Sequence, residues 1–170
     1  MLIAMAGLPG SGKSAIAGEL ARRLPAAHLA VDELEDAMLR AGLRNSFEVG
    51  LAAYLGAEAL AEANLRIGAH VVVDAVNDHA YARGQWYQLA GRADVPLVFV
   101  EVVCTDVELH RQRLEHRRRP YTALPEPTWE SLLPRRAALA QWADERITVD
   151  TANGNPAALA TRVLEELSGR

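Results

Sequence analysis

The chain has 170 residues, of which 50% are hydrophobic and 24% charged, a composition that suits one domain with a buried core. Its net charge of −4 argues against bulk attraction to nucleic acid or membrane, although a local basic groove is still allowed, and its single cysteine, Cys104, excludes an intramolecular disulfide. Because the sequence has no run of about 18 apolar residues and no signal-peptide layout, we expect a cytoplasmic protein without a membrane partner.

Apolar runs and amphipathic stretches alternate along the chain, which predicts an α/β fold with a parallel sheet between helices on both faces. The strands are expected at residues 2–6, 27–31, 70–74, 96–102 and 146–150. The helices are expected at residues 13–23, 33–41, 46–67, 78–91, 105–117, 128–144 and 156–168. No repeat or low-complexity linker divides the sequence, so we expect a single domain over residues 1–170.

The first expected strand leads into G-L-P-G-S-G-K-S at residues 7–14, a match to the phosphate-binding pattern G-x-x-x-x-G-K-[ST]. Its lysine, Lys13, is the only lysine of the chain. The strand before the pattern and the helix behind it argue against a chance glycine-rich turn, so we expect ATP to bind here. The residues expected to bind the phosphates are Gly7, Gly10, Ser11, Gly12, Lys13 and Ser14. Lys13 is also expected to be catalytic, and Ser14 to hold Mg²⁺.

Asp32 is expected at the end of the second strand, at the sheet edge where parallel sheets form their sites. A carboxylate opposite a transferable phosphate can orient an acceptor hydroxyl and take its proton, which makes Asp32 the candidate base. The alternative is that Asp32 caps the next helix. We interpret its neighbours Glu33, Glu35 and Asp36 as solvated acids in the first turn of that helix.

Two further strands end in aspartate. Asp74 closes a β-branched run, which is typical of an acid that supports Mg²⁺ beside a phosphate loop, although a strand-end cap is the alternative. Nearby Asn77 and Asp78 either face the acceptor or cap the following helix. Asp150 lies in a turn where contact with a purine is possible, but ordinary turn chemistry is the favoured interpretation.

Residues 110–119 read H-R-Q-R-L-E-H-R-R-R, directly before a loop with three prolines at residues 120–127. We expect a lid near residues 115–127, because the prolines exclude a helix there. Arg113 and Arg117 are expected on one helix face as catalytic cations, and Arg118 and Arg119 as nucleotide-binding cations. The alternative is a helix end with cations that its dipole favours.

These segments resemble the small P-loop kinases grouped around polynucleotide kinase, zeta toxins and chloramphenicol phosphotransferase, over nearly the whole chain. The stretch V-D-E-L-E-D-A-M at residues 31–38 is similar to the V-D-x-L-x-x-A-M run of chloramphenicol phosphotransferase. The resemblance implies a three-layer P-loop NTPase fold whose five-stranded sheet has the order 2-3-1-4-5. It also implies that Asp32 is the catalytic aspartate.

One position departs from the resemblance. Many of these kinases have an arginine three residues after the catalytic aspartate, whereas this chain has Glu35, which would repel a phosphorylated acceptor. We therefore expect an ATP- and Mg²⁺-dependent kinase that phosphorylates a hydroxyl of a small molecule, such as an antibiotic or metabolite, rather than nucleic acid. The alternatives are an ATPase that acts as a nucleotide-binding regulatory module, and a polynucleotide or nucleotide-sugar kinase.

Overall fold

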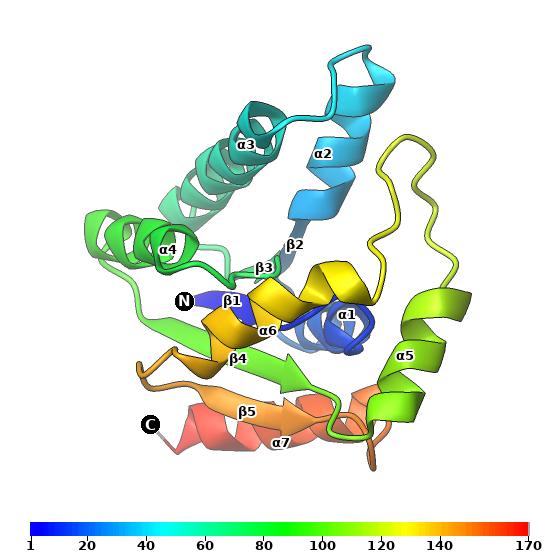
Figure 1. Ribbon diagram of the computed structural model, residues 1–170. Coiled ribbons are helices and arrows are strands. Elements are labelled where there is room, and N and C mark those ends of the chain that lie inside the picture. Colours follow the sequence, from blue (N-terminus) through cyan, green and yellow to red (C-terminus); the bar gives the residue numbers. More distant parts are fainter. Residues whose placement is uncertain (170) are drawn as a thin grey trace.

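A computed structural model describes residues 1–169 as a three-layer α/β arrangement (Figure 1). The strands are β1 (Leu2–Ala6), β2 (Ala27–Ala30), β3 (Val71–Asp74), β4 (Leu97–Val103) and β5 (Ile147–Asp150). They form one parallel sheet in the order β2-β3-β1-β4-β5. The predicted fold class and strand order are confirmed.

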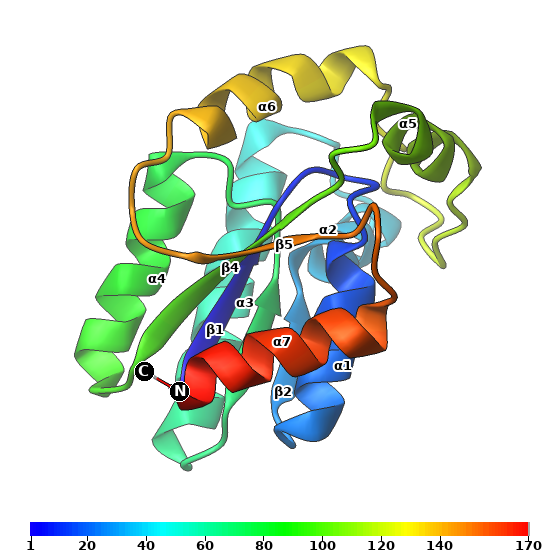
Figure 2. The same ribbon diagram turned by 90° about the horizontal axis from the view of Figure 1, so that it is seen from below.

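The helices are α1 (Lys13–Arg23), α2 (Val31–Arg40), α3 (Phe47–Arg66), α4 (Ala80–Ala93), α5 (Val107–His116), α6 (Leu133–Ala140) and α7 (Pro156–Ser168). One face of the sheet packs against α1 and α7, and the other against α3, α4 and α6 (Figure 2). Among the described helices, none has both the length and the apolar character that a membrane span requires.

The central strand β1 explains why the sheet needs cover on both faces. All five of its side chains are fully buried. Ile3 and Met5 pack with α1 and α7, whereas Leu2, Ala4 and Ala6 pack with α3 and α4. A strand buried on both faces reads as a continuous apolar run, which is why residues 2–6 were identifiable from the sequence.

Two predicted elements differ from the structure. Asp32 does not end β2, because α2 already begins at Val31 and places Asp32 in its first turn, with Ala30 as the N-cap residue. The helix expected at residues 128–144 is shorter: a 3₁₀ turn at Glu130–Leu132 leads into α6, which ends at Ala140. The chain then folds back because the Arg146 guanidinium donates to the backbone oxygens of Trp142 and Asp144, and to Glu101 on β4.

Candidate functional site

The phosphate-binding loop, residues 7–14, joins β1 to α1 in a backbone conformation that requires glycine. Gly7 has φ of 134°, and a Cβ atom there would lie 2.3 Å from the backbone oxygen of Val102. Gly12 has φ of 94° and is the N-cap residue of α1. Left-handed conformations at both ends of the loop turn its N–H groups toward the helix N-terminus, as an anion site requires.

Three contacts fix this loop from behind. Gly7 N–H donates to the backbone oxygen of Val76 at 3.0 Å, and Thr151 Oγ1 donates to that of Ser11 at 2.7 Å. His110 Nε2, on α5, donates to the backbone oxygen of Pro9 at 2.9 Å. Burial lowers the pKa of His110, so its neutral imidazole can serve as a fixed donor. Neither His110 nor Thr151 was predicted to contact the loop, because neither belongs to a local motif.

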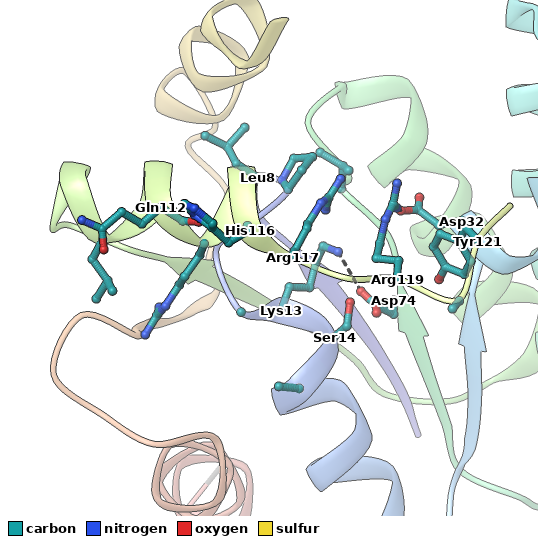
Figure 3. A pocket seen from close by; sticks show the side chains of 18 residues that line it. Leu8, Lys13, Ser14, Asp32, Asp74, Gln112, His116, Arg117, Arg119 and Tyr121 are labelled. Atoms are coloured by element: carbon teal, nitrogen blue, oxygen red, sulfur yellow. Dashed lines mark hydrogen bonds and ion pairs between the residues drawn. The ribbon is translucent and has the colours of Figure 1, made fainter. Parts of the chain in front are cut away.

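Lys13 and Asp74 form a buried ion pair at the carboxyl edge of the sheet. Lys13 Nζ lies 2.9 Å from Asp74 Oδ1, and both side chains are at most 10% exposed (Figure 3). Burial raises the pKa of Asp74, but the Lys13 charge and a hydrogen bond with Ser14 outweigh it and hold the pKa below its usual value. The two predicted magnesium ligands, Ser14 and Asp74, are therefore neighbours, and Asp74 is ionised.

A cavity of about 640 Å³ lies between the phosphate-binding loop and the residues that follow α5. We call residues 117–128 the lid; they contain no helix or strand. The cavity is lined by Leu8, Pro9, Gly10, Gly12, Lys13, Ser14, Ala15, Ala30, Asp32, Asp74, Val76, Leu109, Gln112, Arg113, His116, Arg117, Arg119 and Tyr121. Most of the predicted site residues therefore share one cavity (Figure 3).

Two arginines of the lid, Arg117 and Arg119, line this cavity. Arg119 Nη1 donates to Asp32 Oδ2 at 2.6 Å, and Arg119 Nε donates to Glu126 Oε1 at 2.8 Å. Arg117 Nε donates to the other oxygen of Glu126 at 2.6 Å. The Nη2 atom of Arg119 is buried and has no hydrogen-bond partner within residues 1–169. A buried, unpaired guanidinium nitrogen at a phosphate-binding cavity indicates an anion site.

Of the other two arginines of the predicted cluster, Arg113 also lines the cavity and Arg118 does not. Arg113 donates to Thr151 Oγ1 at 2.8 Å and to the Thr151 backbone oxygen at 3.2 Å, which holds it against the turn between β5 and α7. Arg118 is exposed and lies outside the cavity lining. Arg113 and Arg117 do not share a helix face, because α5 ends at His116 and Arg117 has an extended backbone. That part of the prediction is wrong.

Two further acids lie near Arg135, outside the residues that line the cavity. Burial, followed by the nearby Asp32 charge, raises the pKa of the half-buried Glu35. Asp78 lies at the end of the β3–α4 connection, with its Oδ2 3.7 Å from Arg135 Nε. Asn77 neither faces an acceptor nor caps α4: its Nδ2 donates to the Met5 backbone oxygen at 2.6 Å, and the N-cap residue of α4 is His79.

Asp36 differs most from its predicted role. It is 4% exposed rather than solvated, and its Oδ1 accepts the N–H groups of Thr122, Ala123 and Leu124 at 3.0, 2.8 and 3.0 Å. Arg40 Nε donates to Oδ2 at 2.9 Å. These backbone hydrogen bonds, with that of Ala123 the strongest, hold the pKa of Asp36 below its usual value.

A loop of this kind at the carboxyl edge of a parallel sheet defines a P-loop nucleotide-binding fold. A family model that describes the AAA domain matches residues 2–139, and the chain belongs to that family. A search of curated proteins finds no match.

Similar solved structures include two proteins in complex with a nucleotide or a nucleotide analogue. Kti12 from Chaetomium thermophilum, in complex with ADP-AlF3, is 21% identical over 99% of this chain and 98% of its own, with a TM-score of 0.71. The APS kinase CysC of Mycobacterium tuberculosis, in complex with AMPPNP and APS, is 19% identical over 98% of this chain and 96% of its own, with a TM-score of 0.68. A gluconokinase from Sinorhizobium meliloti 1021 is 18% identical over 98% of this chain and 95% of its own, with a TM-score of 0.64. The chain has a kinase-like P-loop NTPase fold.

Proposed function

We propose that this protein is an ATP-dependent kinase that transfers the terminal phosphoryl group of ATP to a hydroxyl group of a small molecule. One observation carries the proposal: a single cavity holds the phosphate-binding loop, a carboxylate suited to act as base and a lid arginine with an unpaired nitrogen. Phosphoryl transfer needs these three functions, because most of its catalysis is positioning and charge stabilisation.

The loop side of the cavity would bind the nucleotide. The loop N–H groups and the N-terminus of α1 attract the phosphates, and Lys13 exchanges Asp74 for a phosphate oxygen. The Ser14 hydroxyl and the ionised Asp74 offer the oxygen ligands that Mg²⁺ prefers. Bound Mg²⁺ would neutralise charge on the phosphates. Phosphate oxygens and water would complete the coordination of Mg²⁺.

The opposite wall would activate the acceptor. Asp32 is the proposed base, and its carboxylate is paired with Arg119. When Arg119 moves to the phosphates, its Nη1 leaves Asp32 and its buried Nη2 gains a partner. The freed Asp32 can then accept a hydrogen bond, and finally the proton, from an acceptor hydroxyl. One arginine would thus neutralise charge in the transition state and expose the base in the same movement.

The charges near Asp32 favour an acceptor that carries no phosphate. With Arg119 on the nucleotide, Asp32 on the cavity wall and the nearby Glu35 would make this side of the cavity negative, while Arg135 is balanced by Asp78. A phosphate on the acceptor would meet two carboxylates and be repelled. We therefore propose a neutral polyol or an amine-bearing alcohol as the acceptor class.

Product analysis with ATP labelled at its terminal phosphate tests this function. Panels of polyols, amino sugars and phosphorylated sugars are incubated with enzyme and Mg²⁺, and labelled products are separated by chromatography. We expect labelled product from the first two panels. Release of labelled phosphate at the same rate with and without every acceptor would instead identify an ATPase module.

A further inference from the structure

The lid is attached to α2 through its backbone as well as through Arg119. In Figure 1 the lid runs alongside α2 before the chain returns to α6. The N–H groups of residues 122–124 converge on one oxygen of Asp36, at distances of 2.8 to 3.0 Å. Three successive amides on one buried carboxylate oxygen form a compact anion nest, and hydrogen bonds to a charged acceptor are stronger than neutral ones.

Both attachments use one face of one helix. Asp32 and Asp36 lie four residues apart on α2, so their side chains are neighbours one turn apart. Asp32 holds the Arg119 side chain, and Asp36 holds the backbone of residues 122–124. Glu126 ties Arg117 and Arg119 together within the lid itself. The lid and α2 therefore form one connected polar unit.

The two attachments differ in how easily they can be exchanged. The Arg119 guanidinium can rotate on a flexible side chain, and it keeps a buried nitrogen without a partner. The amides bound to Asp36 belong to successive peptide units, so they can leave the carboxylate only if the loop backbone moves. Asp32 thus binds a side chain that can rotate away, whereas Asp36 binds backbone N–H groups that stay in place unless the loop moves.

We propose that Asp36 is a positioning residue that fastens the lid to α2, so that the lid and the acceptor-side helix move over the nucleotide as one body. This inference rests on the proposed kinase function. Arg119 can then exchange Asp32 for a phosphate while the lid backbone keeps its place on α2. Closure on the nucleotide side also carries Asp32 and Glu35, which links acceptor positioning to nucleotide binding.

Hydrogen exchange measured by mass spectrometry tests the anchor without any ligand. Asp36→Ala removes the acceptor, Asp36→Asn keeps an oxygen without charge, and Glu33→Ala is the control, since Glu33 is an exposed acid on the same helix. We expect residues 121–124 to exchange about 10-fold faster in Asp36→Ala, less so in Asp36→Asn, and at the wild-type rate in Glu33→Ala. An unchanged rate in Asp36→Ala, or an equal increase in Glu33→Ala, would overturn the proposal.

ATP turnover separates positioning from simple loop stabilisation. With ATP, Mg²⁺ and an acceptor found by product analysis, we expect Asp36→Ala to lower kcat about 10-fold with a smaller change in KM for ATP, and Asp36→Asn to recover part of kcat. A normal kcat in a variant with a loosened lid would overturn the positioning role. Exchange measured with AMPPNP and Mg²⁺ distinguishes the two proposals: if AMPPNP leaves the wild type unchanged while the Asp36 effect persists, nucleotide binding fails and the anchor stands.

Discussion

The two walls of the cavity are built in different ways. The phosphate-binding loop is held by the sheet and its neighbours, through hydrogen bonds from Gly7, His110 and Thr151 to or from its backbone. The lid contains no regular structure and is held by two carboxylates of α2, Asp32 and Asp36. One wall is thus pre-formed for phosphates, and the other is poised to change partners. If the proposed function holds, nucleotide binding depends mainly on the first wall and catalysis on the second.

Removing the loop lysine should have the largest effect. Lys13→Ala is expected to lower ATP turnover by orders of magnitude, because the chain has no other lysine that could reach the phosphates. The variant also leaves Asp74 buried without the Lys13 charge, and breaking a buried ion pair typically costs about 3–5 kcal/mol of stability. Turnover and the melting temperature are measured together.

A double variant separates these two effects of Lys13. The double variant combines Lys13→Ala with Asp74→Asn, which also removes the charge of the buried Asp74 carboxylate. Its melting temperature should be higher than that of Lys13→Ala, while turnover stays low. Near-normal turnover in either folded variant would refute the nucleotide site.

Removing the proposed base should have the next largest effect, and it should leave the loop wall intact. Asp32→Asn is expected to slow phosphoryl transfer about 10² to 10⁴-fold while ATP affinity changes little, since Asp32 does not contact the loop. Transfer is measured with an acceptor found by product analysis, and affinity by calorimetry with AMPPNP. A variant that transfers phosphate normally would show that Asp32 serves only to hold Arg119.

The lid arginines should differ among themselves. Arg119→Ala is expected to lower kcat about 10²-fold, because a guanidinium on the transferring phosphate is worth much of the charge stabilisation. Arg117→Ala should have a smaller effect, and Arg118→Ala the smallest, since Arg118 is exposed outside the cavity. Steady-state kinetics of the three variants checks this order. Equal effects at all three positions would mean that the cluster acts only through its total charge.

The lid should loosen in acid, and this is the smallest expected effect. The pKa of Asp36 lies below its ordinary value of 3.8, so its contribution is complete above that pH and is lost as the pH falls toward the folded pKa. Exchange at residues 121–124, corrected for the intrinsic rate, should be constant from neutral pH down to about pH 5 and rise below 3.8. The exchange rate in Asp36→Asn should not rise in this pH range. A rise in that variant would show that another titratable group causes the pH dependence.

The loop wall could be predicted from the sequence, whereas the lid wall could be predicted only in part. Residues 7–14 are consecutive, and the spacing of their glycines and lysine predicts the conformation of the loop. The nest on Asp36 joins it to residues 122–124, and nothing in V-D-E-L-E-D-A-M tells an inward carboxylate from a solvated one. A sequence pattern predicts local conformation, whereas the contact of Asp36 with residues 122–124 depends on the path of the loop after α5.

The arginine cluster shows the same limit. The pattern predicted a helix to residue 117, which placed Arg113 and Arg117 on one face. Because α5 ends at His116 and Arg117 is extended, successive residues point to opposite sides. Arg117 and Arg119 therefore reach the cavity, and Arg118 faces solvent. An error of one residue in a helix boundary was enough to change which arginine lies at the site.

A crystal structure with AMPPNP and Mg²⁺ tests the central claim most directly, because the claim concerns two ion pairs that exchange a carboxylate for a phosphate. We predict that Lys13 Nζ leaves Asp74 and that Arg119 leaves Asp32, both for phosphate oxygens, while residues 122–124 stay on Asp36. A nucleotide bound with both ion pairs intact would contradict the account, and so would a nucleotide bound outside the loop.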